Sequence, residues 1–153
     1  MSEWSIRVKR GVAASPEVVW RCVSTPELIS RWWCPPPTVR IDLDPATGVF
    51  RERYDDGETR YEVVGSVIDY EPPSQLTVRR ETPGSATSAD RIAITVTPMA
   101  DASHVLLEHS FEDLPVDRRD EMVAFYADGW HQALAGLAAL AAARIVAARG
   151  RCP

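Results

Sequence analysis

One histidine, His109, is expected to point toward the protein interior. A histidine is a side chain that can transfer protons near neutral pH. His109 alternates with Val105, Leu107 and Phe111, and this period of two predicts a strand with all four side chains on one face. An inward imidazole can hydrogen-bond a ligand carbonyl or act as a general acid or base. The alternative is a buried histidine whose hydrogen bonds are all made within the protein.

Glu52 follows the same alternation between Phe50 and Tyr54, which would aim its carboxylate at the interior. A buried carboxylate is costly unless it is paired, so Glu52 either faces solvent or has an Arg or His partner. If both side chains point inward, a Glu52–His109 pair that polarises a ligand carbonyl is one hypothesis. A register slip of one residue would reverse this orientation.

Other catalytic signatures are missing from the sequence. It contains no nucleophile elbow, no glycine loop of the phosphate-binding kind and no metal-ligand spacing. Cys22, Cys34 and Cys152 are odd in number and widely spaced, so we expect reduced thiols, with Cys22 a small core side chain. The sequence therefore predicts neither a metal nor a cofactor.

The composition argues against several classes of partner. The chain has 153 residues, a net charge of −5 and no basic stripe, which disfavours binding to a nucleic-acid backbone. Its first residues lack an apolar run of signal-peptide length, and its longest uncharged run, 129–143, is too short to span a bilayer. We expect one cytoplasmic domain without a nucleic-acid or membrane partner.

The expected elements follow the order strand, two short helices, about six strands and a long helix. Residues 4–12 suggest the first strand. Ser15 and Thr25 are good N-caps, and each precedes a proline at the first helical position, so we expect a short helix after each. Residues 38–113 alternate in apolar character between turns rich in Gly, Pro and Asp, which is typical of antiparallel strands.

A long amphipathic helix is expected at the end, with Asp117 as N-cap, Arg149 as its last residue and Gly150 as the C′ residue just beyond it. Gly129 inside this helix predicts a close approach or a bend. One face carries the apolar residues Val123, Tyr126, Trp130, Leu134, Leu137 and Ala141. These features predict an α+β fold in which a curved antiparallel sheet of about six to seven strands surrounds one C-terminal helix.

The segment 31–37, RWWCPPP, concentrates two tryptophans at a point where regular structure must stop. Each proline fixes φ and removes a backbone donor, so the second short helix, expected to run through Trp32, should end here. The prolines would then lead the chain into an edge strand, where missing donors are tolerated. We expect Trp32 in the core; for Trp33 the core and a cavity wall are the two alternatives.

The element order and several short motifs resemble the START-like, helix-grip superfamily, also called Bet v 1-like or SRPBCC. Within it they are most similar to the branch named after the C-terminal domain of the activator of the ninety-kDa heat-shock protein's ATPase. The motifs are Pro16-Glu17-Val18-Val19-Trp20, Thr25-Pro26-Glu27-Leu28 with Arg31-Trp32-Trp33, Gly65-x-Val67 with Pro72-Pro73-x-x-Leu76, Leu107-x-His109-Ser110, and Gly129-Trp130-x-x-x-Leu134-x-x-Leu137. The sequence departs from the branch at Thr47-Gly48, where Gly-Gly is usual, and at Phe111, where a Gly usually follows His-Ser.

This resemblance implies a single START-like domain over residues 1–153 with a cavity between the sheet and the long helix. In such proteins the cavity holds a lipid-like, polyketide or other small apolar molecule, so binding is the leading hypothesis. One alternative is a polyketide cyclase or aromatase in which His109 or Glu52 assists proton transfer; another is a co-chaperone that touches a heat-shock ATPase through its surface. The expected ligand-binding residues are Trp33, Phe50, Glu52, Tyr61, Val63, Gly65, Val67, Leu107, His109, Tyr126, Trp130 and Leu134.

Three further expectations concern individual positions. Gly65 either leaves room for a ligand or marks a bulge. His104 and His131 are expected to be exposed, in a turn and on a helix flank. The outer positions of the long helix are not polar, which predicts a homodimer contact unless alanine is present only as a strong helix former. These outer positions are Ala135, Ala139, Ala142 and Val146.

Overall fold

A seven-stranded antiparallel sheet and one long helix dominate the computed structural model, which describes residues 4–33, 39–82, 84 and 87–150, with side chains to residue 145. The strands are β1 (Ser5–Val12), β2 (Val39–Asp44), β3 (Val49–Asp55), β4 (Arg60–Glu71), β5 (Gln75–Glu81), β6 (Asp90–Met99) and β7 (Ala102–Phe111). The helices are α1 (Pro16–Ser24), α2 (Pro26–Ile29), the 3-10 turn η1 (Val116–Arg118) and α3 (Arg119–Gly150).

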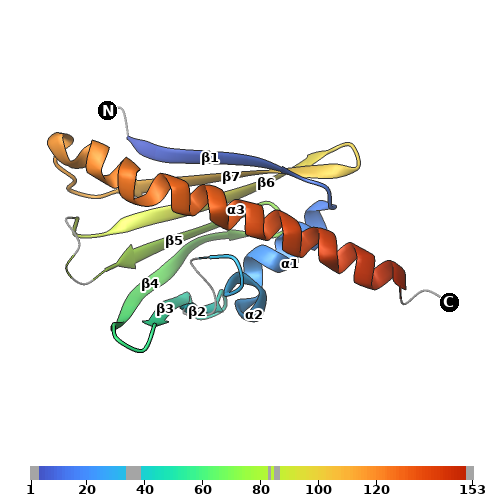
Figure 1. The fold of residues 1–153 in the computed structure, drawn as a ribbon, viewed down its shortest axis with the longest axis horizontal. Coiled ribbons are helices and arrows are strands. Elements are labelled where there is room, and N and C mark those ends of the chain that lie inside the picture. Colours follow the sequence, from blue (N-terminus) through green and yellow to red (C-terminus); the bar gives the residue numbers. More distant parts are fainter. Residues whose placement is uncertain (1–3, 34–38, 83, 85–86, 151–153) are drawn as a thin grey trace.

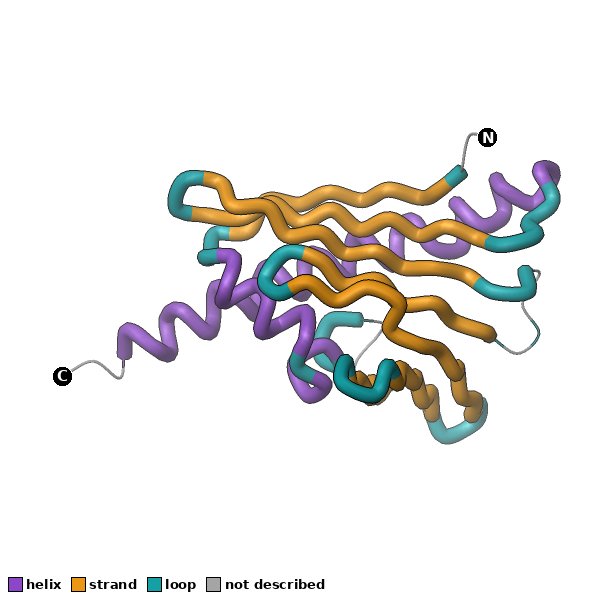
Figure 2. Tube along the Cα trace, turned by 180° about the vertical axis from the view of Figure 1, so that it is seen from behind, coloured by secondary structure: helices purple, strands orange, loops and turns teal. Residues whose placement is uncertain are grey.

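The sheet is curved, and all its helices lie on one side. Its strand order is β1-β7-β6-β5-β4-β3-β2, which puts β1 and β2 at the two edges. The long helix α3 crosses the concave face, and α1 and α2 close the same side near the C-terminal half of α3 (Figure 1). Seen from behind, the other face of the sheet is free of helices (Figure 2). The predicted helix-grip fold is confirmed.

The short helices begin as the sequence predicts, and the second of them ends earlier than predicted. Ser15 caps α1, because its hydroxyl oxygen accepts a hydrogen bond from the Val18 backbone N–H at 3.4 Å, and Pro16 is the first helical residue. The second helix ends at Ile29, one turn before Trp32. The three prolines at 35–37 lie outside the described residues, but the strand that follows them, β2, is an edge strand as expected.

The core lies between the concave face of the sheet and the three helices. Alternate side chains of β6 and β7 are buried, among them Ile92, Ile94 and Leu107, and they meet the apolar face of α3. Trp32 is buried as predicted, and its indole N–H donates to the Cys22 carbonyl oxygen at 2.8 Å. The expectation that Cys22 is a small core side chain is also confirmed.

The inward face of α3 is correctly predicted except at Val123, near the start of the helix. Trp130, Leu134, Leu137 and Ala141 are buried and Tyr126 is half-buried. Val123 is 41% exposed, so burial of this face begins only at Tyr126.

Three local expectations are wrong. Asp117 is not the N-cap of the long helix, because the 3-10 turn η1 already starts at Val116 and leaves Asp117 inside it. His104 lies within β7, opposite Gly11 and Thr97, and is half-buried because strand pairing continues past the point where we expected a turn. His131 is exposed as expected. Gly150, expected just beyond the helix, is instead the last residue of α3, so the helix is one residue longer than predicted.

The glycine in β4 serves a close approach of two strands. A Cβ on Gly65 would lie 2.2 Å from the Arg79 carbonyl oxygen, so any side chain there would displace β5. The register shift of this strand pair lies further along, between Val67 and Asp69. Gly65 is therefore neither the bulge nor a space left for a ligand.

The C-terminal half of α3 carries small apolar residues at the outer positions named from the sequence. Ala139 and Ala142 are exposed and Ala135 is half-buried, whereas the Val146 side chain lies outside the described part. The homodimer contact stays a prediction. Within the described ranges, no helix is both long and apolar enough to cross a membrane.

Candidate functional site

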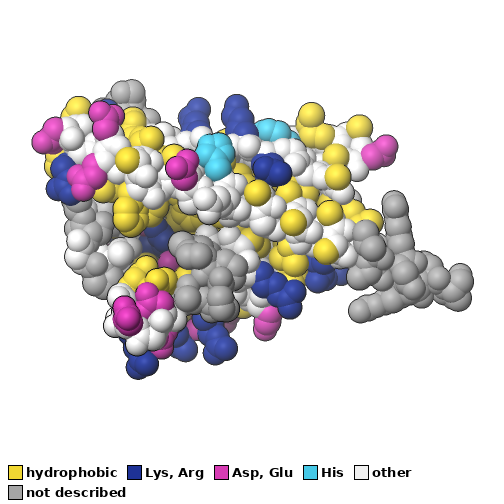
Figure 3. Space-filling view, in the orientation of Figure 1, with side chains coloured by type: hydrophobic (Ala, Val, Ile, Leu, Met, Phe, Trp, Pro, Cys, Tyr) yellow, Lys and Arg dark blue, Asp and Glu magenta, His cyan; other side chains and the backbone are white. Residues whose placement is uncertain are grey.

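A cavity of about 260 Å³ lies between α3 and strands β3, β4 and β5. Its lining residues are Trp33, Glu52, Tyr61, Val63, Arg80, Thr82, Phe125, Tyr126, Gly129 and Trp130. Figure 3 shows a hollow beneath the first half of α3, with acidic and basic side-chain surface at its bottom and a largely hydrophobic rim. Half of the described lining is aromatic, so the cavity combines apolar walls with a charged floor.

Six of the twelve predicted site residues line this cavity: Trp33, Glu52, Tyr61, Val63, Tyr126 and Trp130. Phe50, Leu107 and Leu134 are instead fully buried in the core. Gly65 and Val67 lie further along β4, and His109 is not among the lining residues. Whether the six residues bind a ligand stays a prediction.

Four lining residues, Arg80, Thr82, Phe125 and Gly129, were not expected from the sequence, and Arg80 is the most important of them. The period-two pattern was available, because Leu76, Val78 and Arg80 alternate on β5 in the same way as Ile94, Ile92 and Asp90 on β6. Arg80 and Asp90 stand directly opposite each other in the β5–β6 register. Extending both apolar stripes by one step would have placed this ion pair inside.

Gly129 is the second residue whose role differs from expectation. A Cβ at this position would meet no heavy atom within 4 Å, so the glycine does not serve a close approach to another element. It borders the cavity, where the absence of a side chain keeps space open. The glycine that does sit close to a neighbour is Gly136, whose Cβ would lie 3.5 Å from the Cβ of Trp32.

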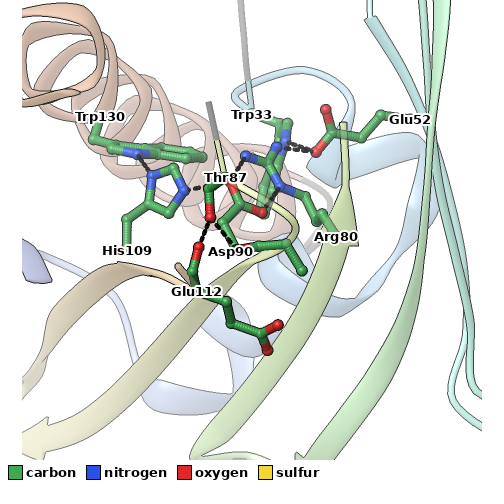
Figure 4. A network of polar contacts seen from close by, with 9 residues as sticks. Trp33, Glu52, Arg80, Thr87, Asp90, His109, Glu112 and Trp130 are labelled. Carbon is green, nitrogen blue, oxygen red and sulfur yellow. Dashed lines mark hydrogen bonds and ion pairs between the residues drawn. The ribbon is translucent and has the colours of Figure 1, made fainter. Parts of the chain in front are cut away.

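A buried ion-pair network forms the floor of the cavity (Figure 4). Arg80 donates from Nε to Oδ1 of Asp90 at 2.9 Å and from Nη2 to Oδ2 at 2.7 Å, a bidentate pair. Its Nη1 donates to Oε1 of Glu52 at 2.6 Å. All three residues are buried, so the expectation that an inward Glu52 has an Arg or His partner is confirmed.

The network continues from Asp90 through His109 to α3. Nε2 of His109 lies 2.7 Å from Oδ2 of Asp90, and the indole N–H of Trp130 donates to Nδ1 of His109 at 3.0 Å. An indole nitrogen can only donate, so Nδ1 must be the unprotonated acceptor and Nε2 must carry the hydrogen. This geometry holds His109 as the neutral Nε2–H tautomer.

These contacts change the role expected of His109. The Glu52–His109 pair does not form, because the Arg80–Asp90 ion pair stands between the two side chains. Both imidazole nitrogens are engaged and the side chain is fully buried, so His109 has no free nitrogen to offer a ligand. The alternative in which its hydrogen bonds are made within the protein describes what the structure shows.

Trp33 closes the network on the cavity side. Its indole N–H donates to Oε1 of Glu52 at 2.8 Å, and its ring contacts that of Trp130 edge-on, with centroids 5.2 Å apart. The two tryptophans therefore stand at opposite ends of one hydrogen-bonded chain and touch each other. Trp33 is both buried and part of the cavity wall, so the core position and the wall position expected as alternatives are compatible.

A loop contact holds Asp90 at the start of β6. The Thr87 hydroxyl contacts the carbonyl oxygen of Glu112, and the Glu112 backbone N–H donates to the carbonyl oxygen of Ala89 at 2.8 Å. These bonds tie the end of the β5–β6 connection to the end of β7 (Figure 4). Asp90 is thereby placed beside both Arg80 and His109.

The pKa shifts agree with this charge arrangement. Burial alone would raise the pKa of Asp90, but the hydrogen bonds from His109 and Arg80 outweigh it and bring the pKa to about 2. Burial alone would lower the pKa of Arg80, but Glu52 and Asp90 raise it above its ordinary value. Burial lowers the pKa of His109, and Asp90 offsets this only in part.

The first prediction concerns the protonation of His109. Because its folded-state pKa lies below the ordinary value of 6.5, the unfolded chain binds more protons below that pH, and the free energy of unfolding should fall as the pH drops below 6.5. In Trp130→Phe the indole donor to Nδ1 is gone, so the His109 pKa should rise and this fall should weaken. Imidazole NMR shifts against pH measure both; titration of wild-type His109 at 6.5 or higher would contradict the assigned tautomer.

A second, larger hollow of about 540 Å³ lies between α2 and β2. Its lining includes Glu27, Arg31, Arg40 and Asp42. None of the described residues in this lining is aromatic, in contrast to the lining of the cavity beneath α3. The cavity beneath α3 is therefore the candidate site.

Comparison with known proteins gives a family and a fold. A family model described as "Activator of Hsp90 ATPase homolog 1-like protein" matches residues 13–142, most of the chain. No functionally curated protein matches the sequence. The evidence for a family therefore comes from the model match, the motifs and the fold.

Solved structures with the same fold come from several proteins. One, from Nitrosomonas europaea, is 21% identical with a TM-score of 0.75, and the match covers 95% of this chain and 99% of that one. CalU16 from Micromonospora echinospora is 20% identical with a TM-score of 0.65 over 93% and 78% of the two chains. DynU16, described as a putative protein in the dynemicin biosynthetic locus, is 23% identical with a TM-score of 0.66, and the match covers 88% of this chain but 45% of DynU16. At these identities the likeness establishes the shared fold.

Proposed function

Because this chain belongs to the family of activator of Hsp90 ATPase homolog 1-like proteins, within the START-like (SRPBCC) superfamily, we propose that it binds a small, mostly apolar molecule beneath α3. The observation that carries the proposal is the cavity lined by aromatic side chains over a charged floor. Apolar walls with a few convergent polar groups are the usual composition of small-molecule sites. The walls supply affinity and the floor fixes the orientation of the ligand.

The size of the cavity restricts which of the implied ligand types would fit. At about 260 Å³ it lies just below the range of roughly 300–1,000 Å³ that is common for ligand pockets. This volume suits a molecule with one or two rings better than a long acyl chain or an extended polyketide. Of the ligand types implied by the family, we therefore propose a small aromatic one.

Ligand binding is a better-supported function for this cavity than acid–base catalysis by His109. The cyclase or aromatase alternative assigns proton transfer to His109, yet this side chain does not line the cavity and both its nitrogens are engaged. General acid or base catalysis requires hydrogen-bond reach to the proton that moves. An enzyme at this site would have to use Glu52 or a tyrosine of the lining instead.

The family's namesake supports a second candidate, action on a heat-shock ATPase through the protein surface. Such activity would not depend on the cavity, because its partner would bind outside. A cavity-filling variant separates the two functions: it should abolish ligand binding and leave any effect on ATP hydrolysis by a chaperone intact. We favour ligand binding because the cavity supplies a defined site.

The proposal is tested by native mass spectrometry on freshly purified protein, with the same sample denatured as control. We expect a mass excess of a small molecule that disappears on denaturation. An apo mass, together with no change in tryptophan fluorescence on addition of small aromatic compounds, would contradict the proposal. Fluorescence is a suitable second readout because Trp33 and Trp130 both line the cavity.

A further inference from the structure

The buried network beneath the cavity carries an excess of negative charge. Glu52 and Asp90 are carboxylates that both accept from the guanidinium of Arg80. His109 adds no positive charge, since Trp130 donates to its Nδ1 and so holds it neutral. Two carboxylates against one guanidinium leave one negative charge in the network. Buried charge of this kind is costly unless something compensates for it.

The uncompensated charge lies on the cavity side, at Glu52. Both hydrogen bonds from Arg80 and Trp33 go to the same oxygen, Oε1. Among the described residues, Oε2 has no hydrogen-bond partner, and it is drawn without a dashed line in Figure 4. The Glu52 side chain lines the cavity with 9% of its surface exposed. Oε2 is not fully buried, because it is open to the cavity that Glu52 lines, so it is placed to accept a hydrogen bond from a ligand.

The walls around this oxygen suit a positively charged group. Trp33, Tyr61, Phe125, Tyr126 and Trp130 contribute aromatic rings to the lining. The face of such a ring attracts an ammonium group, and the attraction grows when water is excluded. The basic residue of the described lining, Arg80, already donates from Nε, Nη1 and Nη2 to the two carboxylates. Arg80 therefore does not neutralise the excess negative charge of Glu52.

We infer that the cavity takes a small aromatic amine whose protonated nitrogen donates to Oε2 of Glu52 while its ring lies among the aromatic walls. This rests on the proposed function and names the chemical class of the ligand. An ammonium group would satisfy the unpaired oxygen and neutralise the network in one contact. A carboxylate ligand would be repelled by Glu52, and a neutral alcohol would supply the hydrogen bond without the charge.

Three probes with the same phenyl ring and a two-carbon linker test the inference on the unmodified protein. They are 2-phenylethylamine, 2-phenylethanol and 3-phenylpropanoate, compared by calorimetry and tryptophan fluorescence at neutral pH. We expect the amine to bind about 10- to 100-fold more tightly than the alcohol, the range for a hydrogen bond to a charged group. The carboxylate should bind most weakly.

A matched pair of variants assigns this preference to one side chain. Glu52→Gln removes the charge and keeps an oxygen acceptor for Arg80 and Trp33, so the affinities for amine and alcohol should converge. Glu62→Gln makes the same change of net charge on the exposed side of β4, where Glu62 pairs with Arg51. This control should keep the amine preference. Circular dichroism and thermal unfolding verify that each variant folds.

The outcomes separate this inference from the proposed function. Binding of the alcohol or the carboxylate at least as tight as that of the amine overturns the inference and leaves the proposed function standing. An amine preference that survives in Glu52→Gln overturns it as well. If none of the three probes binds the wild-type protein, the inference is overturned, and if native mass spectrometry also gives an apo mass, the proposed function fails with it.

Discussion

Replacing Arg80 by methionine is expected to lower the free energy of unfolding by about 3–5 kcal/mol, the usual cost of removing one partner from a buried ion pair. Arg80 is the only cation described between Glu52 and Asp90, and it makes three hydrogen bonds to them. Methionine fills much of the same volume but leaves two carboxylates buried without a counter-charge. Denaturation by urea, monitored by circular dichroism, measures the loss.

The neighbouring arginine is the matched control. Arg79 lies on the opposite face of β5, where it pairs with Glu112 at the surface, and exposed ion pairs contribute about 0–1 kcal/mol. Arg79→Met should therefore cost far less than Arg80→Met. Similar losses for the two variants would contradict the assignment of a buried network.

The pH dependence of Arg80→Met provides an independent signature. Without the guanidinium, burial raises the pKa of the Asp90 carboxyl group above that of the unfolded chain. The folded variant then binds more protons than the unfolded chain, so its deficit relative to wild type should shrink as the pH falls. A deficit that does not change with pH would indicate lost packing instead of lost charge pairing.

Replacing Gly129 by leucine is expected to abolish ligand binding while the fold gains stability. A side chain at this position meets no heavy atom within 4 Å of its Cβ and extends into the cavity that Gly129 borders. Glycine in a helix interior costs about 0.8–1 kcal/mol relative to better helix formers, so the variant should unfold at a higher denaturant concentration. Native mass spectrometry and fluorescence titration measure the loss of binding.

The control for this variant places the same side chain elsewhere on the helix. Ala139 is exposed on the outer face of α3, away from the cavity lining. Ala139→Leu should therefore bind ligand as the wild type does. Unchanged binding in Gly129→Leu would place the ligand outside this cavity, and equal loss in both variants would point to an effect on the helix as a whole.

The sequence predicts the elements well because their signals are local. Ser15 followed by Pro16 marks the start of a helix, and period-two alternation marks strands with one buried face. The same alternation predicts that Glu52 and His109 point inward, and both are buried. Periodicity assigns a side chain to a face without reference to any other strand.

The network itself depends on information that periodicity does not contain. Glu52, Arg80, Asp90 and His109 come from four different strands, and their partners follow from strand register. The Arg80–Asp90 pair results from one cross-strand position, and a slip of either strand by one residue would turn one of the two side chains outward. The neutral state of His109 depends in addition on Trp130, which α3 brings in from a distant part of the chain.

The central claim is that a small molecule binds between the two tryptophans of the network and the sheet, and indole N–H NMR tests it most directly. Trp33 and Trp130 line the cavity and their indole N–H groups donate to Glu52 and His109, whereas Trp4 packs against Phe111 and Trp20 against Tyr70. Titration with the tightest-binding phenyl probe should shift the Trp33 and Trp130 signals and leave those of Trp4 and Trp20 unchanged. Shifts confined to Trp4 or Trp20, or no shift at any tryptophan, would contradict the account.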